Sequence, residues 1–438
     1  MSDELGRVVV SILEGGTVRS SPPVWRSDIP DPRDIPLRGA ASSISLDDVT
    51  LSKHLLFLGG IGTGKTNAMM QILDQLRKPP HTDNDDAIVV FDSKGDFLRE
   101  YYREGDLVLG PRGGSIEGGV VWNLFSDLQQ PEGFSASDGV YEMATTIFGD
   151  ELDRAGDNFF FAAGGRDLLA GMIEALQRDG KPHDNCDLRT SLEMSSKAMW
   201  DMLRSHPDLA GAAQYLDGAG NTPNSIRAFL QQSVNKAFSG VFREKGDFSI
   251  REFVRSRGSK VLFIEYDIAV GSRLLPVYKI LIDTALKQAL EDGRAGRPGR
   301  VFFIMDEFAL LPQLSHISDG INFGRSLGLR FMVGSQNMDQ VIHAYGPELA
   351  RTILSGFGSV FAFRLMDAAS RALIQERFGR NRKQISVESP VRAQGVTQQI
   401  VDGYVLEDWS LSNLTIGQCI VSLPVGLPFL FQFQERKL

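Results

Sequence analysis

The stretch LLFLGGIGTGKTNAMMQI, residues 55–72, decides the fold of this protein. It opens with four apolar residues, which are typical of a short strand buried on both faces. A glycine-rich loop follows and leads directly into apolar residues at helical spacing. Residues 59–66 fit G-x-x-x-x-G-K-[ST], and the strand before and helix after are the context that this phosphate-binding motif requires. A glycine-rich turn that fits by chance is the alternative, but the pattern favours a nucleotide-binding α/β fold.

Each residue type in this loop has a reason to be there. Glycines let backbone N–H groups turn inward onto phosphate oxygens, and the positive end of the following helix points at the same anion. Lys65 is expected to reach the β- and γ-phosphates, and the Thr66 hydroxyl is expected to hold Mg²⁺. The predicted nucleotide-binding residues are Gly59, Gly60, Ile61, Gly62, Thr63, Gly64, Lys65 and Thr66.

The composition bounds the class of protein. The chain has 438 residues, 42% of them hydrophobic and 23% charged, which is ordinary for a soluble globular protein of more than one domain. A net charge of −9 excludes a uniformly basic nucleic-acid binder but leaves room for a local basic surface. Cys186 and Cys419 fit neither a disulfide framework nor a metal cluster, which favours an intracellular setting. No apolar run approaches the roughly 18–20 residues of a membrane span, so we expect no transmembrane segment.

Strand and helix signals alternate outside the middle of the chain. Further strands are predicted at residues 87–91, 261–264, 301–305, 330–334 and 359–363. This alternation indicates a parallel, doubly wound sheet. Residues 126–248 carry only helical patterns and are predicted to form an all-α domain inserted into an α/β domain made of residues 51–125 and 249–438. Residues 1–50, with a strand-like segment at 8–13, are predicted to form an extended arm; a disordered tail is the alternative.

The segment VFFIMDEF, residues 301–308, supplies the second half of the predicted site. A buried strand that delivers a carboxylate at its carboxyl end is what Mg²⁺ coordination beside a phosphate loop requires. Asp306 is the candidate metal-side carboxylate, acting through water, and Glu307 is the candidate base that orients and polarises the attacking water. Gln336 follows the next predicted strand, where an amide can sense the γ-phosphate; a polar strand end without a ligand is the alternative.

Taken together, GGIGTGKT, VVFDSKGDF, the helical insertion, VFFIMDEF, GRSLGLR and GSQN resemble the type IV coupling proteins. These are conjugative DNA-transfer ATPases related to the FtsK and HerA DNA pumps, and the resemblance covers roughly residues 50–435. It implies a RecA-like P-loop NTPase with a predominantly parallel sheet and an inserted all-α domain. It also implies a ring, usually a hexamer, around a channel for single-stranded DNA. The family's metal-binding aspartate, catalytic glutamate, γ-phosphate sensor and arginine finger correspond to Asp306, Glu307, Gln336 and Arg325.

The resemblance thus implies an ATPase that uses ATP and Mg²⁺ and couples hydrolysis to DNA translocation in type IV secretion. Its implied partners are single-stranded DNA or nucleoprotein, identical subunits in the ring, and secretion-channel or relaxosome proteins. Better-known members carry a membrane anchor before the phosphate loop, whereas none of the 64 residues before Lys65 here can span a bilayer. We therefore expect a cytoplasmic protein, free or peripheral at the inner face of the cell membrane.

Two questions stay open at this point. An ATP-switched recruitment receptor, with the helical insertion as its docking surface, is the alternative to a DNA motor. The candidate DNA contacts are the arginines of RFGRNRK, residues 377–383, and of the loop at 293–300. A solvated basic face is the alternative for each of these clusters.

Overall fold

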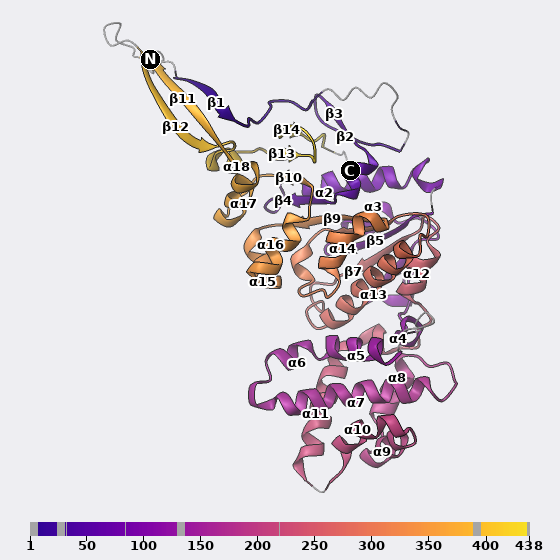
Figure 1. Ribbon diagram of the computed structural model, residues 1–438. Coiled ribbons are helices and arrows are strands. Elements are labelled where there is room, and N and C mark those ends of the chain that lie inside the picture. The colour runs from indigo at the N-terminus through magenta and orange to yellow at the C-terminus, as the bar shows by residue number, and fades with distance from the viewer. Residues whose placement is uncertain are drawn as a thin grey trace. The chain divides into compact units, whose positions relative to one another are not determined.

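The computed structural model, shown in Figure 1, describes residues 8–23, 31, 33–83, 85–128, 136–218, 220–388 and 396–435. The chain divides into two compact units. The first unit comprises Met1–Asn84, Phe302–Pro312 and Ile321–Leu438, and the second comprises Asp85–Val301 and Gln313–Gly320. Among the described residues, no helix is both long and apolar enough to cross a lipid bilayer.

The first unit is built on a mostly parallel sheet with the strand order β14-β13-β10-β4-β9-β8. Its strands are β4 (Leu55–Leu58), β8 (Val301–Met305), β9 (Leu329–Ser335), β10 (Ser359–Ala362), β13 (Gln418–Ser422) and β14 (Phe429–Gln432). Strand β4 runs parallel to both β9 and β10, while β13 and β14 are antiparallel at the edge. Every residue of β4, β8, β9 and β10 is buried, in agreement with the apolar runs that predicted these strands. The carboxyl ends of β4 and β9 therefore meet at one edge of the sheet.

The first unit also contains helices that precede or follow those strands in the chain. They are α1 (Asp48–Ser52), α2 (Lys65–Leu76), α15 (Met338–Tyr345), α16 (Pro347–Ser355), α17 (Ala368–Phe378) and α18 (Asp408–Ser412). Helix α14 (Ile317–Phe323) begins in residues assigned to the second unit, which end at Gly320, and ends in residues assigned to the first. Helix α2 buries an apolar face that includes Ala68, Met69, Ile72 and Leu73. It contacts β9, so the helix that follows the phosphate-binding motif packs on the parallel sheet.

The chain before β4 packs against the first unit. Strands β2 (Ile35–Arg38) and β3 (Ser43–Leu46) form a hairpin with alternating buried apolar residues. Further upstream, Arg19 donates its N–H to Pro428 and accepts from the N–H of Leu430, both over 2.8 Å, so this part of the chain runs along β14. The proline-rich residues 24–30 of the predicted arm lie outside the described part of the chain.

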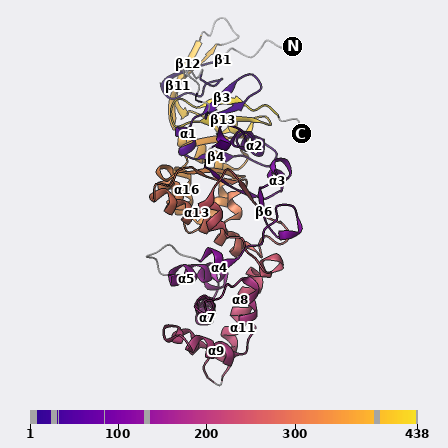
Figure 2. The ribbon, with the colours of Figure 1, turned by 90° about the vertical axis from the view of Figure 1, so that its right-hand side faces the viewer.

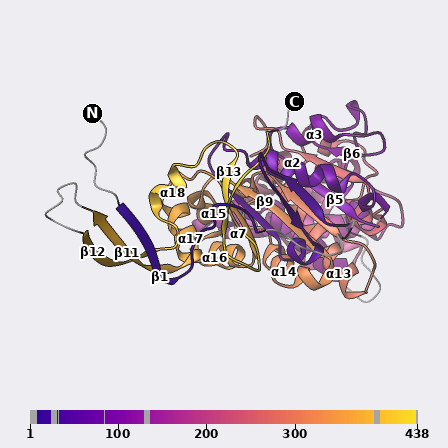
Figure 3. The ribbon, with the colours of Figure 1, turned by 90° about the horizontal axis from the view of Figure 1, so that it is seen from above.

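A separate antiparallel sheet forms from strands far apart in the sequence. Figure 3 shows β1 (Val8–Gly15), β11 (Arg380–Glu388) and β12 (Val396–Tyr404) side by side, and their registers confirm the order β1-β11-β12. Most described side chains of this sheet are exposed or half-buried. The strand-like segment at 8–13 was predicted, whereas β11 and β12 were not, because their sequences are largely polar.

The second unit contains the parallel strands β5 (Ala87–Asp92), β7 (Val261–Glu265) and β6 (Leu107–Leu109), in the order β5-β7-β6. Helices α12 (Ile250–Ser256) and α13 (Leu275–Arg294) pack on each other in this unit. Asp92, at the end of β5, is fully buried. Its carboxylate accepts from the backbone N–H groups of Gly95 (2.8 Å) and Leu98 (2.9 Å), so it fixes the turn that leads into α3 (Asp96–Tyr101).

A block of helices completes the second unit, and the described residues between 124 and 237 form no strand. The helices are α4 (Leu124–Asp127), α5 (Ala136–Ile147), α6 (Gly149–Asp153), α7 (Phe159–Gln177), α8 (Asn185–Leu192), α9 (Ser196–Arg204), α10 (Ala210–Ala213) and α11 (Asn221–Ala237). Helix α7 packs on α5, α8, α9 and α11, as Figure 2 illustrates. The compact units place β5, β6 and β7 with these helices, so an inserted domain bounded at 126 and 248 stays a prediction.

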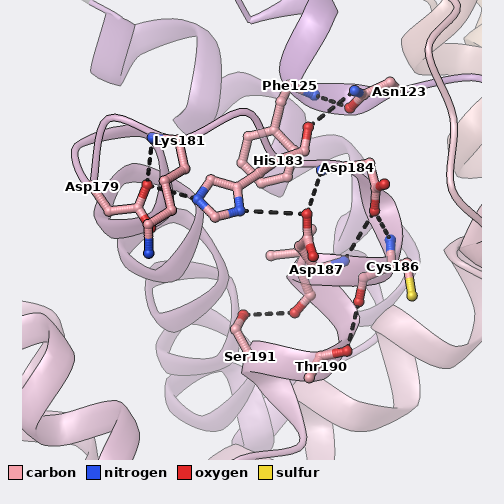
Figure 4. Close-up of polar contacts among 11 residues, drawn as sticks. Asn123, Phe125, Asp179, Lys181, His183, Asp184, Cys186, Asp187, Thr190 and Ser191 are labelled. Atoms are coloured by element: carbon pink, nitrogen blue, oxygen red, sulfur yellow. Dashed lines mark hydrogen bonds and ion pairs between the residues drawn. The ribbon is translucent and has the colours of Figure 1, made fainter.

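Polar contacts fix the turn between α7 and α8 (Figure 4). The Asp184 carboxylate accepts hydrogen bonds from the N–H groups of Cys186 (2.8 Å) and Asp187 (3.1 Å). The Asp187 carboxylate in turn accepts a hydrogen bond from the N–H of Asp184. The His183 ring lies between the carboxylates of Asp179 (2.8 Å) and Asp187 (3.4 Å). This capping box defines where α8 begins.

Candidate nucleotide-binding site

The predicted phosphate-binding loop, residues 59–66, joins β4 to α2 and is fixed by its neighbours. The N–H of Gly59 donates to the carbonyl of Ser335 at the end of β9 (3.2 Å), and the N–H of Gly60 donates to the carbonyl of Arg364 (3.0 Å). On a third side, the N–H of Gly417 donates to the carbonyl of Thr63 (2.9 Å). The loop is therefore held by residues at or near the ends of three strands of the same unit.

Two glycines of the loop occupy positions that other residues cannot take. Gly64, which caps α2, has φ +110°, and a Cβ there would lie 3.0 Å from the Cα of Gly417. At Gly59, a Cβ would lie 2.6 Å from the Cβ of Phe363. The glycines that the sequence motif demands are thus required by backbone conformation and by close packing.

Lys65, at the first position of α2, is buried, with 7% of its surface exposed. Its ammonium donates to the carbonyl of Gly59 and to that of Gly60 (3.1 Å), so the charge points back into the loop. The positive end of the α2 dipole lies at the same place. Phosphate oxygens are stronger acceptors for an ammonium than carbonyls, so this arrangement is suited to hold an anion.

The Thr66 hydroxyl and the Asp306 carboxylate, both predicted metal-side residues, lie together. The hydroxyl donates to Asp306 over 3.1 Å, and Asp306 follows the last residue of β8. Oxygen donors of this kind fit Mg²⁺, which takes one or two carboxylate ligands and completes its shell with phosphate and water. Among the described residues, no group of three or more acidic, histidine or cysteine side chains could hold a metal ion.

Strand β9 reaches this position because Gly334 lacks a side chain. A Cβ at Gly334 would lie 2.2 Å from the carbonyl oxygen of Asp306. The sequence contains this glycine in FMVGSQN, but no pattern in the sequence indicates its contact with Asp306. Gly334 and Gly417 are therefore residues of the site that sequence reasoning missed.

Glu307 is nearly buried, with 7% exposed, and burial raises the pKa of its carboxyl above the ordinary 4.5. The charge of Lys65 and hydrogen bonding from the side chain and backbone of Gln336 oppose this rise. Its Oε1 atom is buried without a hydrogen-bond partner among the described residues. A buried acceptor of this kind is ready to hold a water molecule. The structure thus brings Lys65, Glu307 and Gln336 together, as the motif order predicted.

Arg325 does not join this cluster. It lies exposed in the short 3-10 helix η8 (Gly324–Leu327), before the amino end of β9, whereas Gln336 follows the carboxyl end. Burial lowers the pKa of His54 to about 4, and the charge of Arg325 contributes to that shift. His54 itself precedes the amino end of β4. Arg325 therefore lies at the amino ends of the parallel strands, whereas Lys65 lies at their carboxyl ends. The length of β9 alone separates the amino ends of the strands from their carboxyl ends by about 20 Å.

Two of the candidate DNA-contacting arginines, and a lysine beside them, have partners within the protein. Arg377 donates to the carbonyl of Phe357 (2.6 Å), and Lys383 forms an ion pair with Glu407. In the 293–300 loop, Arg300 forms a bidentate pair with Asp86, with a shortest contact of 2.8 Å. These contacts favour a structural role for the three residues.

The chain matches, over residues 38–421, the family model described as the type IV secretion-system coupling protein DNA-binding domain. Among solved structures, it is similar to the plasmid coupling protein TrwB in complex with the ATP analogue ADPNP. That similarity has a TM-score of 0.74 and 20% identity, and it covers 99% of this chain and 97% of that one. TrwB in complex with ADP and Mg²⁺ matches with the same values.

A more distant similarity links the chain to VirB4 of Thermoanaerobacter pseudethanolicus, with a TM-score of 0.54 and 14% identity over 93% of this chain and 98% of that one. A comparison with curated protein sequences gave no significant match. At these identities the solved structures support the fold, and they confirm the predicted RecA-like α/β class with a mostly parallel sheet.

Proposed function

Because this chain belongs to the type IV secretion-system coupling protein family, we propose that it is an ATPase that drives single-stranded DNA through a ring of its own subunits. The observation that carries the ATPase part is the hydrogen bond between Thr66 and Asp306 beside the buried carboxyl of Glu307. Phosphate-binding, metal-binding and water-activating groups are the parts that nucleotide hydrolysis needs in one place.

ATP binding falls to the loop at 59–66. The β- and γ-phosphates of ATP take the place of the Gly59 and Gly60 carbonyls as acceptors for the Lys65 ammonium. Thr66 and Asp306 would hold Mg²⁺, which would neutralise charge on the phosphates. Support comes from TrwB, whose structures are described as complexes with ADPNP and with ADP and Mg²⁺.

Hydrolysis falls to Glu307 and Gln336. The free Oε1 atom of Glu307 accepts a hydrogen bond from the attacking water and polarises it. Hydrogen bonding from Gln336 holds the carboxylate in place and links it to the γ-phosphate end of the site. Burial raises the pKa of Glu307 and so makes its carboxylate a better proton acceptor than a solvated one.

Arg325 serves the site of a neighbouring subunit. An arginine at the opposite sheet edge cannot reach the phosphate loop of its own chain, but a head-to-tail ring places unlike surfaces against each other. Across such an interface, a guanidinium adds transition-state stabilisation of roughly 10³–10⁵ in rate in related nucleotidases. Hydrolysis then depends on assembly, which suits a hexameric ring.

The DNA-translocating part rests on the family match, since the matched domain is described as DNA-binding. A translocating motor must grip the strand along its whole track, so binding is expected to be largely blind to sequence and to weaken with salt. The protein would act on the cytoplasmic side of the membrane, with secretion-channel or relaxosome proteins as partners.

The deciding experiment measures the ATPase rate with and without a single-stranded oligonucleotide, together with the mass of the assembly. We expect single-stranded DNA to stimulate turnover, and Glu307→Gln protein prepared in parallel sets the background rate. Slow hydrolysis that DNA does not change would argue against a motor. It would favour the second candidate, an ATP-switched receptor that recruits a protein substrate.

A further inference from the structure

A cavity of about 690 Å³ lies within the second unit, apart from the nucleotide site. Its walls come from α8, α11, the short 3-10 helix η6 (Gly240–Arg243) and the loop between β7 and α13. The lining includes three arginines and three apolar residues, namely Arg189, Arg243, Arg273, Phe238, Val270 and Leu274. The volume falls within the roughly 300–1,000 Å³ typical of ligand pockets.

The cavity presents positive charge. No carboxylate is among its lining residues in the described part of the chain. Arg273 donates to the backbone carbonyl of Asn235 (3.0 Å), which leaves its charge uncompensated at that contact. Arg189 and Arg243 pair with Glu193 and Glu244, both at 3.1 Å. Both glutamates are more than half exposed, and such surface pairs contribute little, so these guanidinium groups are available to a ligand.

The elements that carry Arg189 and Arg243 are tied together by Asn185, the first residue of α8. Asn185 is fully buried, and its amide donates to the carbonyls of Trp122 (2.8 Å) and Phe242 (3.0 Å). The start of α8 is fixed further by the capping box seen in Figure 4. A site on elements held in this way loses little conformational freedom when it binds.

We propose that this cavity binds the sugar-phosphate backbone of single-stranded DNA through Arg189, Arg243 and Arg273. The inference rests on the proposed function and assigns the grip on the strand to a specific site. The planar guanidinium fork matches phosphate oxygens in bidentate geometry, and the apolar Val270 and Leu274 suit the deoxyribose between phosphates.

The cavity offers no platform for bases. Phe238, the aromatic residue in its lining, is 2% exposed and stacks on Trp122, so its face is already covered. Base stacking requires an accessible aromatic face. The site therefore reads backbone rather than sequence, as a motor requires. An acidic peptide is the competing ligand, and DNA is favoured because the DNA-binding family match at 38–421 contains all three arginines.

The first test measures the affinity of the full chain for a fluorescent oligo(dT) by anisotropy across a salt series. The variant carries Arg189→Gln, Arg243→Gln and Arg273→Gln together. Each phosphate contact on a single strand contributes about 0.7 to the slope of log K against log salt concentration. Loss of three contacts is expected to reduce the slope by about 2 and to weaken binding at low salt at least tenfold.

The matched control loses the same charge elsewhere in the second unit. Arg99, Arg204 and Arg255 are exposed and lie outside the cavity lining, so their triple change to Gln should leave the slope within a few tenths of the parent value. Equal slopes in the cavity variant and the parent would overturn the proposal while leaving the proposed function intact. Absence of oligonucleotide binding by the parent protein would overturn both.

A second test uses the unmodified chain and so does not depend on folding of a variant. Phenylglyoxal modifies accessible arginines, and mass spectrometry locates them. Oligo(dT) should protect Arg189, Arg243 and Arg273 several-fold, while poly-glutamate should not. ATP supplied to Lys65→Ala protein, whose own nucleotide site is disabled, should not protect them either. Protection by poly-glutamate but not by DNA would overturn the proposal in favour of an acidic protein partner; protection by ATP alone would assign the cavity to nucleotides.

Discussion

The hydroxyl of Thr66 donates a hydrogen bond to the carboxylate of Asp306 across 3.1 Å, although 240 residues separate them in the chain. One follows β4 and the other follows β8, and both strands belong to the sheet of the first unit. The geometry of this pair makes the nucleotide site a property of the folded sheet rather than of the motif alone.

Replacing Lys65 with alanine is expected to weaken nucleotide binding, because the positive charge in the loop is lost. Lys65→Ala removes the buried ammonium, which donates two hydrogen bonds into the loop, and should weaken ATP binding about 10²-fold or more. Lys78→Ala is the matched control, because Lys78 lies just past α2 in an exposed pair with Asp74. Titration with a fluorescent ATP analogue measures both. Tight binding with normal turnover in Lys65→Ala would refute the assignment of the loop.

Substitutions of the two carboxylates that follow β8 are expected to have different effects on activity. Glu307→Gln keeps the shape of the side chain but cannot accept a proton, so ATP binding should persist while hydrolysis slows by roughly 10²–10⁴. Asp306→Asn should instead raise the Mg²⁺ concentration needed for half-maximal activity. Steady-state rates across a Mg²⁺ series separate the two effects. A normal rate in Glu307→Gln would mean that another group positions the water.

Burial of Glu307 also predicts a dependence of stability on pH. Its pKa is raised in the folded protein, so the folded state holds the proton to higher pH than the unfolded state does. Stability therefore falls as pH rises from about 4.5 through the raised pKa. Glu307→Gln should raise the melting temperature near pH 7, with a smaller gain near pH 4. Glu348→Gln, an exposed change, should shift neither; equal gains at both pH values would contradict the burial argument.

The position of Arg325 at the far sheet edge predicts complementation between inactive proteins. Arg325→Ala and Lys65→Ala should each be nearly inactive alone. In mixed rings, some interfaces pair an intact phosphate loop with an intact arginine, so part of the ATPase activity should return. Native mass spectrometry establishes that mixed rings form. Co-assembly without recovered activity would show that Arg325 is not the finger, or that turnover requires every site at once.

The contact between Gly334 and Asp306 predicts that a single methyl group disables the site. Gly334→Ala places a Cβ 2.2 Å from the Asp306 carbonyl and should cost about 1–3 kcal/mol of stability as β9 shifts. The shift displaces Asp306, so hydrolysis should fall further than folding does. Gly149→Ala, where nothing lies within 4 Å of the added carbon, is the control. Full activity in Gly334→Ala would show that β9 can move without disturbing Asp306.

Much of this site could be predicted because its strands have a recognisable sequence pattern. Strands β4 and β8 are short apolar runs buried on both faces, and the structure places both at the predicted bounds. The residues that follow them are functional types in a fixed order, so Lys65, Asp306 and Glu307 were expected to meet. Gln336 was placed by the same logic after β9.

Other features had no signal in the local pattern. The hairpin of β11 and β12 carries polar residues on both faces, so it was not predicted, and residues 377–383, which include the start of β11, were interpreted as a basic cluster. The inward pairing of Arg300 with Asp86 depends on a partner 214 residues away. The cavity arginines come from three separate elements, none of which has a recognisable basic motif. Periodicity describes one element at a time and cannot report contacts of this kind.

The backbone of Arg19 along β14 has a consequence for how the protein behaves at high concentration. An unpaired outer strand presents a row of N–H and C=O groups that can recruit a strand from another molecule. Here the groups next to Phe429 are already taken by Arg19, and Gly39 bridges to Phe433 further along. The sheet of the first unit is thus closed at this edge by its own chain. At this edge, contact with another copy is thereby left to side-chain surfaces instead of to open backbone, which would favour fibres.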